Sequence, residues 1–233
     1  TSISQKTTMK KRLFLIWVFA MSFFLTMCGQ QTLPPEACDR AITNAIKYIN
    51  EYYFTNQTIW LDSALMSLNR VEGKCEEYRN HIALHKSHAL FLYQKYRQAI
   101  NNIKKSDDKL LPYAEFKYIL ISKIKAKQAG QRQQFQKQRK YYEQIVAEYD
   151  KYLLRNKNHV DSVLCQSDIQ SIVNTQPGIV LAEKYYYKSK ITHTKDIILE
   201  LDSIQKFIKG NEAYFDTLKK IVDGKIQPNI LPE

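Results

Sequence analysis

The chain has 233 residues, of which 35 are basic and 23 acidic, and a formal net charge of +12. Its hydrophobic content of 44% with only six glycines and six prolines excludes a collagen-like repeat and a low-complexity disordered chain. Length and composition predict one compact helical domain behind the N-terminal segment.

The N-terminal segment has the features of an export signal. A basic stretch from Lys10 to Arg12 follows the first methionine, Met9, and a run without charged residues covers 13–27, apolar except at Ser22 and Thr26. This run suits the core of a signal peptide and is shorter than the roughly 20 residues that span a bilayer. We predict a signal peptide over 9–27, with a short uncleaved anchor helix as the alternative. In both cases the rest of the chain leaves the cytoplasm.

The end of the apolar run resembles a lipobox, the sequence at which lipoprotein signal peptidase cuts before a diacylated cysteine. In Leu25-Thr26-Met27-Cys28, the first two residues fit the pattern, whereas Met27 stands where small residues are usual. The resemblance implies lipidation of Cys28 and a lipid-anchored tether over 28–35. It also implies a bacterial cell-envelope protein that faces the periplasm. Without residues 1–27 the chain keeps 31 basic and 23 acidic residues.

Apolar residues recur at helical spacing between residues 36 and 155. Short polar or glycine-containing breaks separate the periodic segments, and prolines at the start suit a first helical turn. The pattern predicts antiparallel helix pairs joined by short turns. The expected helices cover 36–54, 59–74, 76–93, 96–105, 112–129 and 132–154.

Two of the expected pairs share the same spacing of apolar and small residues, at an offset of 35 positions: Leu61, Ala64, Leu65 and Leu68 against Tyr96, Ala99, Ile100 and Ile103. The pattern resembles the tetratricopeptide repeat, whose unit is about 34 residues. Residues 81–112 fit best, with Ser87 at a small position and Pro112 at the end of the unit. Tyr52 and Gln138 depart from the pattern, because the family has small residues there. The resemblance implies an all-α fold with about three tetratricopeptide-like pairs over 36–155.

The pattern changes beyond Asn156. Residues 160–173 and 179–190 read as helices, Gln176-Pro177-Gly178 reads as a turn, and apolar stripes follow on each side of Gly210. We predict a C-terminal helical cap over 156–233 that covers the exposed apolar face of the last repeat.

Four short sequences resemble the Asp-Ser/Thr-apolar O-glycosylation sequon of Bacteroidetes envelope proteins. They begin at Asp62, Asp161, Asp202 and Asp216. Asp and Ser also begin helices well, which is the simpler explanation. Together with the lipobox, this resemblance implies a Bacteroidetes-type envelope lipoprotein.

Cys38 and Cys75 are the best candidate disulfide pair. Their midpoint falls between Asn56 and Gln57, inside the turn expected for the first hairpin, so the two thiols would face each other at its open end. An oxidising envelope favours the bond, and two buried free thiols are the alternative. Cys165 is expected to be unpaired and buried. No CxxC spacing points to structural zinc.

His81, His85 and His88 form one stripe of an expected helix, and a His-x3-His pair can chelate a metal. No HExxH sequence accompanies them, so we expect solvated or groove-lining histidines and neither metal nor cofactor. In the repeat alignment, His81 and His88 fall on the concave groove. We expect Phe91 and Tyr93 to act beside them as aromatic anchors for a partner.

Eight basic residues and no acid lie between residues 117 and 142. A solvated face is the ordinary explanation, while a protein with an acidic face, an anionic lipid or a glycan could each be attracted. Nucleic acid is not expected for an exported chain. The candidate partner-binding residues in this segment are Lys117, Lys123, Lys127, Arg132 and Arg139.

Signatures of catalysis are lacking in the sequence: there is no GxSxG, Walker loop or GxGxxG. We therefore expect no enzyme, but a membrane-anchored helical-repeat module that binds another protein. The alternative is an immunity protein that neutralises a delivered toxin in the periplasm. A hydrolase or metal-dependent enzyme using the histidine stripe is a third hypothesis.

Overall fold

The computed structural model describes residues 32–108 and 114–227, and within these ranges the regular structure is entirely helical. This confirms the predicted all-α fold. The expected signal peptide and Cys28 lie outside the described residues. None of the described helices is long and apolar enough to cross a membrane.

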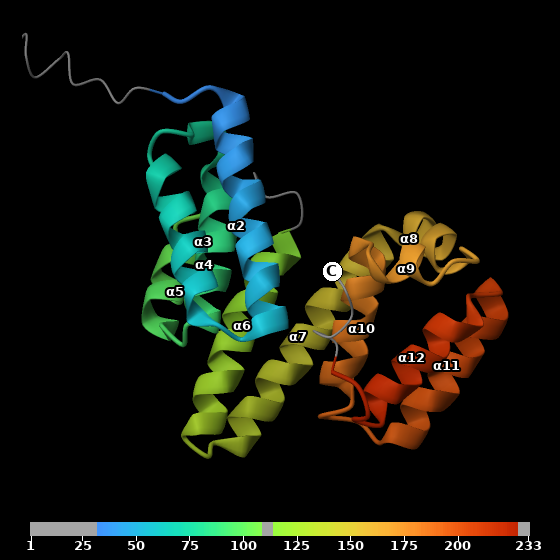
Figure 1. The fold of residues 1–233 in the computed structure, drawn as a ribbon. Coiled ribbons are helices and arrows are strands. Elements are labelled where there is room, and N and C mark those ends of the chain that lie inside the picture. Colours follow the sequence, from blue (N-terminus) through green and yellow to red (C-terminus); the bar gives the residue numbers. More distant parts are fainter. Residues whose placement is uncertain (1–31, 109–113, 228–233) are drawn as a thin grey trace, which may run out of the picture.

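The helices of the first half pack as consecutive pairs (Figure 1). The pairs are α2 (Pro35–Thr55) with α3 (Thr58–Val71), α4 (Arg79–Leu92) with α5 (Tyr96–Ile103), and α6 (Ala114–Gln131) with α7 (Phe135–Arg155). A 3-10 turn, Glu76–Tyr78, precedes α4. All six expected helices are present, with ends within three residues of those expected. The tetratricopeptide resemblance implies such pairing, but the resemblance itself stays a prediction.

Local chemistry sets both ends of α2. Pro34 is the N-cap and Pro35 takes the first helical position, where the missing N–H costs no intrahelical bond. At the other end Asn56 adopts a left-handed backbone with φ of 54°, and its N–H bonds to the carbonyl of Tyr52. The chain then turns directly into α3.

Small residues allow the paired helices to approach closely. Ala64 and Ala99, which occupy matching positions in the two aligned copies, are completely buried. Ser87 is also completely buried, and its hydroxyl accepts a 2.8 Å hydrogen bond from the Asn102 amide. The same amide donates to the carbonyl of Ala83, so this buried polar contact is satisfied.

The predicted disulfide between Cys38 and Cys75 is confirmed. It joins the first turn of α2 to the segment before α4, with 6.0 Å between the two Cα atoms. Both cysteines are buried in the apolar cluster that Ile42 and Val71 also occupy. Because the N–H of Leu33 bonds to the carbonyl of Lys74 nearby, the described chain is fixed where it enters the fold.

Five more helices follow: α8 (Lys157–Leu164), α9 (Gln170–Val173), α10 (Gln176–Lys188), α11 (Thr194–Ile208) and α12 (Glu212–Val222). Helix α10 packs against α7, and its Val180 is buried in the same cluster as Ile145 and Tyr149. A separate core, in which Tyr185 and Phe215 are completely buried, holds α8 to α12 together.

Two helix boundaries in this half were predicted wrongly. Residues 160–173 form two helices, because the carboxylate of Asp168 accepts hydrogen bonds from the N–H groups of Gln170 and Ser171 and so begins a new helix. Gln176-Pro177-Gly178 is the first turn of α10 instead of a loop. Thr175 caps it, and proline is well suited to a first turn.

Cys165 is exposed, against the expectation that it is buried. It directly follows the last residue of α8, and its thiol donates to the carbonyl of Ile208, 2.9 Å away. Cysteine is usually buried, which is why burial was predicted. Cys165 is exposed because it lies at the end of a helix.

Loss of the disulfide should destabilise the fold by about 4 kcal/mol, because the bond closes a loop of 37 residues. We expect Cys38→Ser/Cys75→Ser to lower the free energy of unfolding by this order in denaturant titrations, while Cys165→Ser has little effect. Equal stability of the double variant and the parent, or free alkylation of both thiols without reductant, would contradict the bond.

Candidate functional site

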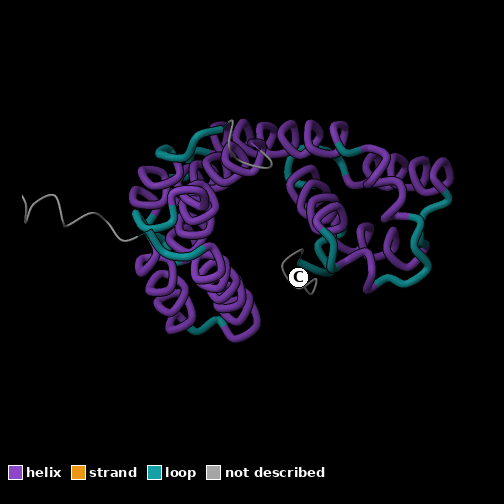
Figure 2. Tube along the Cα trace, turned by 90° about the horizontal axis from the view of Figure 1, so that it is seen from above, coloured by secondary structure: helices purple, strands orange, loops and turns teal. Residues whose placement is uncertain are grey.

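The helices follow an open arc, with the helix pairs on one side and the C-terminal helices on the other (Figure 2). A cavity of about 760 Å³ lies on the inner side of this arc, lined by residues of α2, α4, α6, α7 and α10. This volume is within the range of roughly 300–1,000 Å³ that is typical of ligand pockets. It is therefore the candidate functional site.

Most of the cavity wall is apolar. The wall residues come from helices that are far apart in the sequence, so the cavity exists only when the two sides of the arc are held together. The aliphatic and phenylalanine side chains are Ile46, Ile49, Leu84, Phe91, Leu92, Phe116, Ile119, Leu120, Ile179 and Val180.

One partly buried ion pair interrupts this apolar wall. The ammonium group of Lys123 in α6 lies 2.6 Å from the carboxylate of Glu183 in α10, and the Tyr149 hydroxyl of α7 donates to the same carboxylate. Burial alone would raise the pKa of Glu183, but the charge and hydrogen bond of Lys123 and the Tyr149 hydroxyl outweigh it, so the pKa is lowered. Glu183 is thus ionised at neutral pH and held by two donors.

Two histidines of α4 face the same cavity. The Tyr53 hydroxyl and Nε2 of His88 share a hydrogen bond of 2.8 Å. Burial, followed by the charge of Lys123, lowers the pKa of His88 to about 4. Burial, followed by the proximity of His81, lowers the pKa of His85 to about 4. Both rings are therefore uncharged at neutral pH.

Several hydrogen-bonding groups on the wall are left for a ligand. The ring nitrogens of His85 and the hydroxyls of Tyr186 and Tyr187 have no hydrogen-bond partner among residues 32–108 and 114–227. The cavity therefore combines an apolar wall with a few polar groups, which is the usual composition of a binding site.

Three of the four candidate groove residues lie at the cavity, and the fourth lies outside it. His81, His88 and Phe91 line the cavity. Tyr93 does not line it, because its hydroxyl donates to the carboxylate of Asp62 in α3, 3.3 Å away. Their role in binding a partner stays a prediction.

The sequence suggested that the basic residues of α6 and α7 form one solvated surface. The structure instead places some of them inside the fold. Lys117 is buried, where it donates to the carbonyl of Ser106 and pairs with Asp108, each at 2.6 Å. Lys123 lies in the cavity. Both residues point inward because α6 packs against neighbours on more than one side, including α4, α5 and α7.

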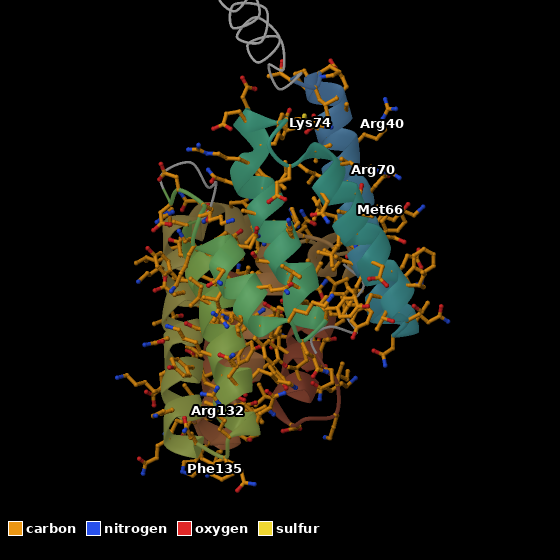
Figure 3. The ribbon with its side chains drawn as sticks, turned by 90° about the vertical axis from the view of Figure 1, so that its left-hand side faces the viewer. Arg40, Met66, Arg70, Lys74, Arg132 and Phe135 are labelled. Carbon is orange, nitrogen blue, oxygen red and sulfur yellow. A yellow bond between two sulfur atoms is a disulfide. The ribbon has the colours of Figure 1, made fainter. Side chains whose placement is uncertain are left out.

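The exposed part of this basic segment gathers around the turn between α6 and α7. Figure 3 shows Arg132 and Phe135 at this turn, at the opposite end of the molecule from Lys74. Phe135 is 69% exposed, and Lys127 is exposed close by in sequence. Arg139 is exposed as well, and it donates to the carbonyl of Ile191 while pairing with Glu143. We call Lys127, Arg132, Phe135 and Arg139 the basic end.

The sequence reading missed Glu183, Tyr149 and Tyr187. A signal for Glu183 was present: Ile179, Glu183 and Tyr187 recur at intervals of four, which places an acid in the middle of an apolar helical stripe. Nothing in the sequence could show that its partner is Lys123, because 60 positions separate them.

Within the described ranges, no group of three or more histidine, cysteine or acidic side chains is arranged to hold a metal ion. Comparisons with protein-family models, curated proteins and solved structures found no match for this chain.

The two buried histidines should make stability depend on pH. The unfolded chain binds their protons with a pKa near 6.5 and the folded chain only near 4, so stability is complete above about pH 6.5 and falls as the pH drops towards 4. At pH 5 each histidine should cost on the order of 2 kcal/mol. Denaturant titrations at pH 7.5 and 5 measure this loss.

His88→Gln should remove about half of the pH-dependent loss, whereas the exposed His159→Gln should leave it unchanged. An identical pH dependence in the parent and in His88→Gln would contradict the assignment.

Proposed function

We propose that the chain is a membrane-anchored binding module of the bacterial envelope, which receives a partner protein on the inner side of its helical arc. The observation that supports this most is the cavity with its apolar wall. Helices form most of the wall, so a partner meets a surface whose backbone is already ordered, and less conformational entropy is lost on binding.

The chemistry of the cavity favours binding over catalysis. The carboxylate of Glu183 is occupied by Lys123 and Tyr149, and a carboxylate so held is a weak general base. His88 shares its Nε2 with the Tyr53 hydroxyl, and burial makes its ring a poor proton acceptor near neutral pH. These groups hold the wall together, which suits a site that binds without reacting.

The positive charge of the basic end indicates which charge the expected partner carries. Lys127 and Arg132 are exposed and have no acidic partner among the described residues, and Phe135 beside them is an exposed aromatic side chain. Charges of this kind mainly speed the encounter with an oppositely charged surface, while an aromatic anchor contributes more of the affinity. We therefore propose a partner with an acidic face.

The test is cross-linking of the full chain in native envelopes and identification of the captured proteins. Lys127→Glu/Arg132→Glu/Arg139→Glu should lower the capture of the true partner more than tenfold at low salt, and high salt should lower capture by the parent. Lys123 is left intact because it belongs to the fold.

The matched control reverses three exposed basic residues at the opposite end, Arg40, Arg70 and Lys74, and so changes the net charge equally. It should capture the partner as the parent does. Equal capture by both variants would contradict the proposal, as would a partner retained at all salt concentrations. Cys28→Ala should release the chain from the membrane fraction without affecting the partner's affinity. A captured protein that proves to be a delivered toxin would favour the immunity role.

A further inference from the structure

An apolar strip of the cavity wall lies next to the ion pair. On α10 the lining residues run in the order Gln176, Ile179, Val180, Glu183, Tyr186 and Tyr187, so the aliphatic pair lies one turn before the acid and two tyrosines follow it. On α6 the aliphatic residues Ile119 and Leu120 likewise lie one turn before Lys123. The ion pair therefore separates an apolar channel, which begins at Gln176, from a part of the cavity that the tyrosines of α10 line.

The apolar part of this channel offers almost nothing to a peptide backbone. Its wall consists of helix interiors, whose N–H and C=O groups are already bonded within each helix. A protein segment lying there would bring one donor and one acceptor per residue, and each unpaired group would cost free energy. A hydrocarbon chain brings neither, so it fits this part of the cavity better.

The polar end is rich in donors and has no net charge. Lys123 uses one N–H for Glu183, and its side chain is 15% exposed, so further N–H groups are free to donate. The His85 ring and the Tyr187 hydroxyl line the same cavity and have no partner among the described residues. Because the charges of Lys123 and Glu183 compensate each other, an uncharged acceptor such as a carbonyl suits this end better than a carboxylate.

We propose that the cavity binds the hydrocarbon chain of an uncharged acyl ester. The ester carbonyl accepts hydrogen bonds from the donors at the Lys123 end, and the chain lies along Ile119, Leu120, Ile179 and Val180. Lining residues of α10 from Gln176 to Glu183 extend about 10 Å along the helix axis, which accommodates part of an extended acyl chain. This site goes beyond the proposed function, because the acyl chain fills the cavity itself, whereas the partner protein would contact the rim of the cavity and the basic end.

A photoactivatable monomyristoylglycerol with a diazirine on its acyl chain tests the site directly. The full chain is held in an amphipathic polymer, irradiated with the probe and mapped by mass spectrometry. Saturable labelling is expected in α6 and α10, around Ile119, Leu120, Ile179 and Val180. Unlabelled monomyristoylglycerol should halve the labelling at a concentration at least ten times lower than myristate does at pH 8. The reason is that myristate adds a negative charge beside Glu183.

Ile179→Trp fills the cavity and should reduce labelling at least tenfold with an unchanged melting temperature. Leu84→Trp, on the opposite wall, provides a second filling variant should the first fail to fold. Leu154→Trp is the control, because Leu154 is 77% exposed and does not line the cavity. Labelling that persists in a folded filling variant would overturn the site. Equal competition by myristate would overturn the uncharged headgroup, and cross-links from the cavity to a co-purified protein would overturn the acyl occupant.

Discussion

The ion pair between Lys123 and Glu183 is the interaction on which the cavity depends. It connects α6 of the helix pairs to α10 of the C-terminal helices, while the Tyr149 hydroxyl ties α7 to the same carboxylate. Charges taken out of water lose hydration, so such a pair contributes little net stability, but loss of one partner leaves the other buried and unpaired. The pair thus specifies the spacing between the two sides more than it stabilises them.

The inside and the outside of the arc present different chemistries. Inside, burial keeps His85 and His88 uncharged, and the opposite charges of Lys123 and Glu183 cancel. The cavity therefore favours an uncharged, mainly apolar occupant. Outside, Arg132 and its neighbours are solvated and carry the excess positive charge. The module can therefore attract a charged partner at one place and hold an apolar group at another, without either surface weakening the other.

Local sequence signals predicted local structure well. Apolar periodicity located the first six helices, and the symmetry of Cys38 and Cys75 about one turn predicted the disulfide. The helix start at Asp168 was not predicted. The apolar periodicity continues across it, and only hydrogen bonds to the Asp168 carboxylate begin the new helix. Burial of Lys117 and partial burial of Lys123 were not predicted, because lysine is ordinarily exposed and only the packing of the folded chain brings Asp108 and Glu183 to them.

A double-mutant cycle measures whether the ion pair between Lys123 and Glu183 couples the two sides of the cavity. Lys123→Met and Glu183→Leu should each destabilise the full chain by roughly 1–3 kcal/mol, because each leaves a partly buried charge without its partner. The double variant should regain much of this loss, with a coupling energy above about 2 kcal/mol from denaturant titrations. Two small and additive effects would contradict the account, because the pair would then be solvated and the two sides of the cavity would be held by other contacts.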